Sequence, residues 1–315
     1  MPDELFDARN YLNIGSYNQA IAEASSAGCA SHKGEDVANF EAEKTAIICR
    51  AQLGLGQVDL VLSQLKSATH PVLKSVSLWA NFLSSTRGAD PSAADVALNQ
   101  LVANAEVVSL ANIYGAIFAT AALLNRNQVA EGLTLAKRWL ADLPEPEQSR
   151  SFAYIELRSL VVEGLLRLNR ADRAVEEVAA MEKLDDEAVL TILYLGLVYL
   201  AQGQLDNKEE SYNSALASFK DIAMRYSNST WVLNLIGVTQ MCLGDFEASK
   251  NSLLEALSLR SDDGDTLSNL VAVCNQIGLD TQRYFAQASQ QQSLYAHQYR
   301  AASDAFDVAV RDFKH

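Results

Sequence analysis

The sequence predicts an all-α protein: antiparallel helix pairs stacked into a right-handed solenoid, with a C-terminal capping helix. Three observations predict this fold. Of 315 residues only 5 are proline and 15 glycine, fewer than many short strands joined by turns would need. Apolar residues make up 49% of the chain, enough for a long core. One sequence pattern recurs along the chain: an apolar helix, a turn at Gly or Asn, and a second helix.

The length predicts two domains or one elongated array. We assign residues 1–297 to the helical array and residues 298–315 to the capping helix. The tail is predicted as a Gln-rich helix over residues 282–292 and an amphipathic helix over residues 298–313. One face of this last helix is apolar and carries Ala302, Phe306, Ala309, Val310 and Phe313.

In the N-terminal half, the recurring pattern is found at residues 11–24, 53–62 and 123–133. The pair near residues 76–103 is poorly marked, so its register stays open. Breaks between helices are predicted where Gly, Pro or polar residues cluster. They fall at residues 28–34, 70–71, 88–91, 143–147 and 261–265.

In the C-terminal half, Gly237 and Gly244 lie seven residues apart, and Val271 and Gly278 follow them after 34 residues. This is the length of one two-helix repeat. A helix that ends on Gly or Asn can turn through a left-handed conformation. The recurrence therefore predicts stacked helix hairpins, which bury their apolar faces only against neighbours.

The same two-residue mark appears 41 residues before Gly237 and Gly244, at Gly196 and Gly203. That spacing is one period plus seven residues, and we place the insertion at residues 206–212. It is interpreted as a solvated insertion, with a contact loop as the alternative. Small residues are expected where paired helices approach, and large ones where gaps need filling. The small ones are Ala20, Ala130, Ala174 and Ala215, and the large ones Tyr199, Phe219 and Leu253.

This pattern resembles the tetratricopeptide repeat. That motif expects Trp, Gly, Gly, an aromatic residue and Ala where this chain has Trp231, Gly237, Gly244, Phe246 and Ala256. The match is strong over residues 230–261 and weaker elsewhere. The alternative interpretation is another kind of helical hairpin array, with nearly the same function.

Charge limits the partners. The chain has 25 basic and 39 acidic residues and a net charge of −14, so no nucleic-acid partner is expected. An anionic membrane would repel this surface, so membrane contact is expected only through another protein. The apolar stretches at residues 107–124 and 188–201 are interpreted as buried helices, and the acidic N-terminus does not resemble a secretory signal.

No catalytic, cofactor or metal site is predicted. The four His residues are not paired with acidic residues at ligand spacing, and no nucleophile elbow or phosphate loop occurs. The four Cys are expected to be reduced, buried thiols. The acidic pairs Asp185-Asp186 and Asp262-Asp263 are interpreted as helix caps rather than general acid–base pairs.

What remains is surface. The first helix of each pair is expected to line a concave groove that suits a peptide, hairpin or helix of another protein. Helical spacing selects Leu190, Leu193, Leu197, Trp231, Asn234, Val238, Met241 and Asn275 as the groove residues. It also selects Asn112, Ala119, Glu156, Ser159, Glu163, Ser268 and Ala272. The alternative for Leu193, Leu197 and Trp231 is packing inside the solenoid.

Four blocks of the chain resemble the coatomer epsilon-subunit family. They are LFDARNYLNIGSYNQAIAEA at residues 5–24, LNRADRAVEEVAAMEKLDDEAVLTIL at 168–193, the stretch 233–278, and the closing 302–306 with Val310. The similarity extends over nearly the full length and departs from the family's pattern at residues 206–212 and 76–103.

The resemblance implies a non-enzymatic scaffold of the COPI vesicle coat, without cofactors. It implies that the chain binds the C-terminal domain of the coatomer alpha subunit, and so joins the cytoplasmic coat on Golgi membranes and vesicles. Two other readings remain. A co-chaperone that clamps acidic tails would need Lys and Arg in the groove, and a helical transferase would need a titratable cluster.

Overall fold

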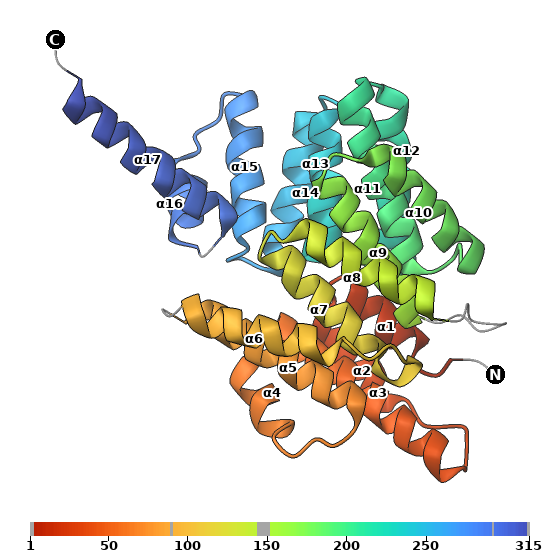
Figure 1. Ribbon diagram of the computed structural model, residues 1–315. Coiled ribbons are helices and arrows are strands. Elements are labelled where there is room, and N and C mark those ends of the chain that lie inside the picture. Colours follow the sequence, from red (N-terminus) through yellow and green to blue (C-terminus); the bar gives the residue numbers. More distant parts are fainter. Residues whose placement is uncertain (1–2, 89–90, 144–151, 292, 314–315) are drawn as a thin grey trace. The chain divides into compact units, whose positions relative to one another are not determined.

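The computed structural model describes residues 3–88, 91–143, 152–291 and 293–313. Every regular element in these ranges is a helix, which confirms the all-α prediction (Figure 1). The chain divides into two compact units, Met1–Leu205 and Asp206–His315. Each unit is described by itself below.

Unit 1 contains five helix pairs and one further helix. Their bounds are α1 Phe6–Asn13, α2 Tyr17–Ser26, α3 Gly34–Gly54, α4 Val58–Gln64, α5 Pro71–Arg87, α6 Pro91–Asn104, the short 3-10 helix η1 Leu110–Asn112, α7 Ile113–Asn125, α8 Val129–Asp142, α9 Phe152–Arg167, α10 Ala171–Leu184 and α11 Val189–Asp206. Each pair packs within itself, and the second helix of each of the first four pairs packs on the first helix of the next. The first helices α1, α3, α5, α7 and α9 also contact one another in sequence.

Unit 2 continues the same arrangement. Its helices are α12 Glu209–Tyr226, α13 Thr230–Cys242, α14 Phe246–Leu259, α15 Gly264–Gln276, α16 Gln282–Gln290 and α17 Leu294–Asp312. The first helices α13 and α15 contact each other as well as α14, and α17 packs on α15 and α16.

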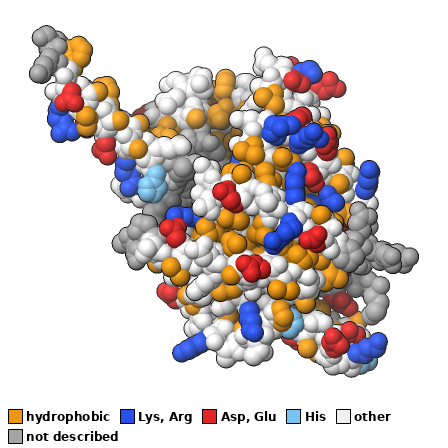
Figure 2. Space-filling model, in the orientation of Figure 1, with side chains coloured by type: hydrophobic (Ala, Val, Ile, Leu, Met, Phe, Trp, Pro, Cys, Tyr) orange, Lys and Arg blue, Asp and Glu red, His pale blue; other side chains and the backbone are white. Residues whose placement is uncertain are grey.

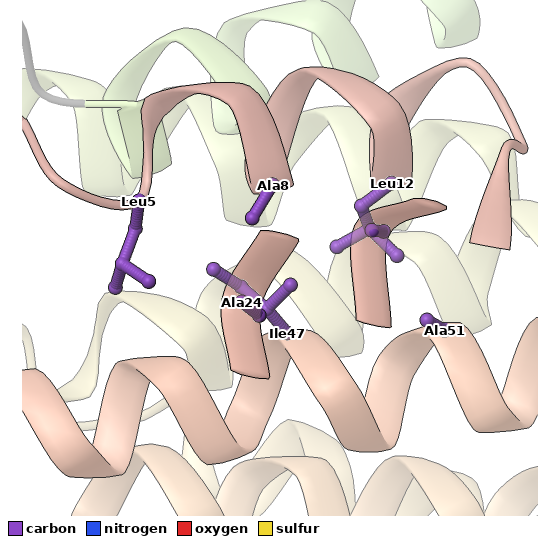
Figure 3. Packing of buried hydrophobic residues seen from close by; sticks show 7 residues of the cluster. Leu5, Ala8, Leu12, Ala24, Ile47 and Ala51 are labelled. Atoms are coloured by element: carbon purple, nitrogen blue, oxygen red, sulfur yellow. The ribbon is translucent and has the colours of Figure 1, made fainter. Parts of the chain in front are cut away.

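The first three helices show how the pairs hold together. Leu5, Ala8 and Leu12 lie in one line at the start of the chain and along α1, facing α2 and α3 (Figure 3). They meet Ala24 of α2 and, in α3, Ile47 and Ala51. Small side chains at the crossing let the helices approach, while Leu and Ile fill the space between them. Gly54 serves the same purpose, because a Cβ there would overlap the ring of Tyr17.

The predicted turns are confirmed where Gly or Asn ends a first helix. The backbone is left-handed at Gly15, Gly56 and Gly244, with φ of 80°, 82° and 79°. Asn127 and Asn169 take the same conformation at φ of 58° and 55°. These are the residue types that adopt a positive φ at little cost.

The predicted turn at Gly203 is wrong. Gly203 is buried inside α11, and the left-handed turn residue is Asn207, at φ 50°. The extra residues lengthen both helices: α11 and α12 have 18 residues each, against 13 and 14 in α13 and α14. The insertion at residues 206–212 is solvated over residues 206–210, which are exposed, but it is mostly helix rather than loop. Its last residue, Tyr212, is buried.

The remaining local predictions had mixed outcomes. The open register near residues 76–103 is settled by α5, which begins on Pro71, and α6, which begins on Pro91, the last residue of the predicted break at residues 88–91. Ala20, Ala174 and Ala215 are fully buried, but Ala130 is exposed. Gly132 lies against Leu124 in its place. In the predicted break at residues 143–147 only Leu143 is described.

The helix α17 begins at Leu294 rather than at residue 298, because the Ser293 side chain accepts a hydrogen bond from the backbone N–H of Ala296 and caps it. Its first half packs on α15 and α16, with Tyr299 edge-on to Phe285 at 4.9 Å between ring centroids. Its second half projects away from both helices (Figure 1). Phe306, Val310 and Phe313 are exposed there.

Of the described helices, α11 alone is long and apolar enough to cross a membrane by length and composition. A core helix of a soluble protein passes the same test. The interpretation of residues 188–201 as a buried helix holds for its first half, since Val189 to Tyr194 are buried. In the second half, Leu195, Leu197 and residues 199–201 are partly exposed.

Candidate partner-binding surfaces

The first helices of unit 1 carry a layer of arginine and aromatic side chains, which we call the Arg–aromatic layer: Arg9, Arg50, Tyr114, Phe118 and Phe152. The Arg50 guanidinium lies over the rings of Tyr114 and Phe118, at 5.8 and 5.4 Å from their centroids. The Arg9 guanidinium lies 5.3 Å from the centroid of Phe152. These distances suit cation–π attraction.

Carboxylates complete the layer. Arg50 of α3 donates from both terminal nitrogens to Glu156 of α9, Nη1 to Oε2 at 3.2 Å. Arg9 of α1 is paired with Asp3 and with Glu43 of α3. The side chains of Arg50 and Glu156 are each only 16% exposed, so this pair is largely removed from water.

The electrostatics of this layer follow from burial. Burial by itself lowers the pKa of Arg50, but the Glu156 carboxylate and Tyr114 together outweigh it, and the pKa is raised. Burial also raises the pKa of Tyr114, with the Glu43 carboxylate adding to the effect, so the phenol stays neutral. The layer therefore holds its arginines in pairs with carboxylates, beside a buried neutral phenol.

Sequence spacing found part of this layer and missed the rest. Glu156 was selected as a groove residue and does lie on the first-helix face, where its carboxylate is paired with Arg50. Arg50 was not singled out. A signal existed, since Arg50 is a single charge within the apolar run TAIICRAQL of α3. A charge inside an apolar helix needs a buried partner.

In unit 2 the first helices are joined by short polar side chains. Asn234 Nδ2 donates to the Thr266 hydroxyl at 2.5 Å, and Asn269 Nδ2 donates to Asn234 Oδ1 at 3.0 Å. Asp263 caps α15 by accepting from the Thr266 N–H at 3.0 Å and its hydroxyl at 2.7 Å. The capping role expected of Asp262-Asp263 is filled by Asp263.

The eight predicted groove residues differ in exposure. Leu190, Leu193 and Asn234 are buried, and Leu193 is fully so. Leu197, Val238 and Met241 are partly exposed, and Trp231 and Asn275 are exposed. Packing inside the chain, the alternative considered for Leu193, fits its burial. Met241 also packs against the core of Leu253, Leu270 and Val273.

One stripe of α13 remains open to solvent, which we call the α13 stripe: Trp231, Leu235 and Val238. Trp231 is 41% exposed and the other two are partly exposed. Leu235 was missed because the predicted face stepped three residues from Trp231, to Asn234, rather than four. Residues three and four positions apart both lie on one helix face. Asn234 is covered because its side chain contacts α15, whereas Leu235 stays partly exposed.

Two other features were checked for chemistry. No group of three or more His, Cys, Asp or Glu residues that could hold a metal ion occurs in the described ranges. Cys49 and Cys274 are buried as expected, but Cys29 and Cys242 are partly exposed. Burial raises the pKa of Cys49 to about 11, so its thiol is protonated at neutral pH.

Comparison with known proteins identifies the family. The family model described as "Coatomer epsilon subunit" matches residues 1–314. Coatomer subunit epsilon-1 of Oryza sativa subsp. japonica is 29% identical over 98% of this chain and 98% of its own length. Coatomer subunit epsilon-1 of Arabidopsis thaliana is 27% identical over 99% and 98%. Coatomer subunit epsilon of Dictyostelium discoideum is 25% identical over 85% and 83%.

Solved structures support the fold alone. TTC0263, a tetratricopeptide-repeat protein of Thermus thermophilus, superposes with a TM-score of 0.53 at 18% identity, over 62% of this chain and 99% of its own. A monomeric mutant of IFIT1 with Gppp-AAAA superposes with a TM-score of 0.52 at 13% identity, over 92% and 78%. The tetratricopeptide-like fold class is thereby confirmed. With a family model matched from residue 1 to residue 314 and relatives aligned over nearly their whole length, this chain belongs to the coatomer epsilon-subunit family.

Proposed function

We propose that this protein is a non-enzymatic structural subunit of the COPI vesicle coat, which binds and stabilises the C-terminal domain of the coatomer alpha subunit. The family match over residues 1–314 carries the proposal. The protein then acts in Golgi-to-ER and intra-Golgi transport, in the cytoplasm and peripherally on Golgi membranes and COPI vesicles. Its net charge of −14 supports membrane contact through the rest of the coat rather than directly.

The partner surface in unit 2 is proposed to be the α13 stripe together with Asn275 of α15, and Leu197 of α11 is proposed as a contact in unit 1. These residues keep exposed or partly exposed side chains. An exposed Trp flanked by Leu and Val supplies the large apolar contact on which protein interfaces depend. The buried residues Leu190, Leu193 and Asn234 are proposed to support the surface from behind without touching the partner.

The clamp for acidic tails receives no support from the arginines of unit 1. Each of Arg9, Arg50 and Arg158 is already paired with a carboxylate of the chain. A clamp needs cations free to bind carboxylates of the ligand. The coat-scaffold proposal is therefore preferred.

Co-purification tests the proposal. The chain is expressed with the C-terminal domain of its cognate alpha subunit, and the complex is measured by size exclusion with light scattering. We expect a stoichiometric complex that Trp231→Asp abolishes. The matched control is Met224→Asp in α12, because Met224 is 80% exposed and lies outside the proposed surface. Helical circular dichroism must be preserved in both variants.

Each outcome has a distinct meaning. A complex that resists both substitutions supports the partner and moves the surface elsewhere. A complex lost in both variants shows that added charge, rather than the stripe, is responsible. A folded wild-type chain that forms no complex overturns the proposed function.

A further inference from the structure

The geometry points to Arg50 as a clasp across unit 1: with Glu156 it ties the second helix pair to the fifth and sets the curvature of the unit. This inference concerns the free chain and is independent of any partner.

The distance between α3 and α9 along the stack of first helices is the first observation. The helix α3 opens the second pair and α9 opens the fifth, with α5 and α7 between them along the chain. Packed helices lie about 8–10 Å apart, so three steps of a straight stack would place α3 about 25–30 Å from α9. Yet Arg50 of α3 donates to Glu156 of α9 at 3.2 Å. The first helices of unit 1 therefore curve back on themselves.

The second step is the first helix pair, which meets α9 independently. Phe6 of α1 is edge-on to Phe152 of α9, with 5.6 Å between ring centroids. Arg9 of α1 also meets this ring, with its guanidinium 5.3 Å from the Phe152 centroid. In the ribbon, α1 lies next to α9, although three helix pairs lie between the pairs that these two helices open (Figure 1). Contacts from α1 and from α3 thus both bring the first two helix pairs against α9.

The third step is why arginine performs this role. The Arg50 side chain extends across the rings of Tyr114 and Phe118 in α7 before it reaches Glu156. Its planar guanidinium can stack on a ring with its face and donate two hydrogen bonds with its edge. A lysine would keep the charge but lose both the stacking and the fork. The pair is mostly desolvated, so losing one partner leaves a charge buried without compensation.

The chain supplies a matched control. Arg158 is paired with Glu177 at 2.9 Å and lies 5.3 Å from the centroid of the Tyr154 ring. Its side chain and that of Glu177 are 17% and 21% exposed, close to the values for Arg50 and Glu156. This pair joins α9 to α10, which are neighbours in one helix pair. It has the same chemistry as the Arg50–Glu156 pair but joins only two neighbouring helices.

The test measures a distance. Spin labels are placed on Ala22→Cys in α2 and Glu182→Cys in α10, two exposed positions on helices that pack against α1 and α9. The partly exposed cysteines are removed as Cys29→Ser and Cys242→Ser, and the buried Cys49 and Cys274 are retained. Pulsed electron paramagnetic resonance then reports the distance distribution across unit 1.

We expect one narrow distance peak in the parent chain and in Arg158→Gln, and a broadened distribution with a longer mean in Arg50→Gln. Both variants should lower the Tm, by about 5–10 °C, because each leaves a half-buried glutamate without its partner. The Tm therefore reports a structural role for either arginine, whereas the distance reports the clasp. Arg50→Lys should fall between the parent and Arg50→Gln.

A narrow, unshifted peak in Arg50→Gln would overturn the inference, and so would equal broadening in Arg158→Gln. If Arg50→Gln does not fold, Glu156→Gln provides the same measurement, because it keeps the shape of the side chain and removes only the charge. A narrow peak in Glu156→Gln would overturn the inference in the same way.

Discussion

The first helices of the two units are joined by different kinds of side chain. In unit 1 the first helices are joined by arginines, aromatic rings and carboxylates, and Arg50 extends past α7 to Glu156 of α9. In unit 2 the first helices α13 and α15 are joined by Asn234, Thr266 and Asn269. Short polar side chains reach only the adjacent helix, so they fix its register. Long arginines reach helices beyond it, so they also fix how sharply the stack curves.

The largest expected effect concerns the core of unit 1. Trp139 in α8 is fully buried, and its Nε1–H donates to the Ala105 carbonyl at 2.9 Å. Trp139→Ala should lower the free energy of unfolding by about 3–5 kcal/mol, because it leaves a large cavity. Thiol labelling of Cys49 in increasing urea measures it, since this buried thiol reacts only when unit 1 opens.

Two controls sharpen that measurement. Cys274 is the buried thiol of unit 2, and labelling both cysteines shows which unit opens first. In the parent chain we expect Cys274 to react at lower urea, because unit 2 has the shorter chain and the smaller core. Trp139→Phe keeps most of the packing and should lose only about 1 kcal/mol with the hydrogen bond. A change in the Cys274 midpoint alone would contradict the assignment of Trp139 to unit 1.

The polar contact of unit 2 should have the next largest effect. Asn234→Leu removes the donor to the Thr266 hydroxyl and the acceptor of the Asn269 amide, and it should cost about 1–3 kcal/mol, measured at Cys274. Trp231→Ala on the same helix should cost less, because its side chain is 41% exposed. The reverse order would place Trp231 in the core and Asn234 on the surface.

A helix cap gives a smaller effect. Asp263→Ala removes the acceptor of the Thr266 N–H at the start of α15 and should cost about 1 kcal/mol. Its neighbour Asp262 is exposed and contacts only the Arg260 side chain, at 3.4 Å, among the ion pairs of the described chain. Asp262→Ala should therefore leave the urea midpoint nearly unchanged. Equal losses in the two variants would show that charge near α15, and not the cap, is responsible.

These residues also show how far the sequence could predict the structure. The repeat period located α13, α14 and α15 and the turn glycines, because Gly244 and Gly278 satisfy a local backbone requirement that recurs at the ends of several first helices. The period failed at Gly203, because this glycine lies buried inside the long apolar helix α11 rather than at its end. The turn moved to Asn207, which adopts a positive φ nearly as easily.

The candidate surfaces were less predictable than the fold. Spacing identifies the face of a helix but does not say which of two adjacent stripes is covered, so Asn234 was selected where Leu235 is partly exposed. The contact of Arg50 with Glu156 joins positions 106 residues apart. No local pattern encodes such a contact, although the single charge in an apolar helix indicates that a partner must exist.

The smallest expected effect divides one helix into two halves. Tyr299 in the first half of α17 packs edge-on against Phe285. Phe306 lies two helical turns further on, 69% exposed, among the apolar side chains that Figure 2 shows along the projecting half of the helix. Phe306→Ser should change the free energy of unfolding by no more than about 0.5 kcal/mol, because the two residues have similar helix propensities and the ring leaves little buried surface. Tyr299→Ser should cost about 1–2 kcal/mol through the lost aromatic contact and burial. Urea unfolding followed at Cys274 compares them. A loss at Phe306 equal to that at Tyr299 would show that the second half of α17 packs on the chain in solution, and would remove the distinction between an anchored and a projecting half.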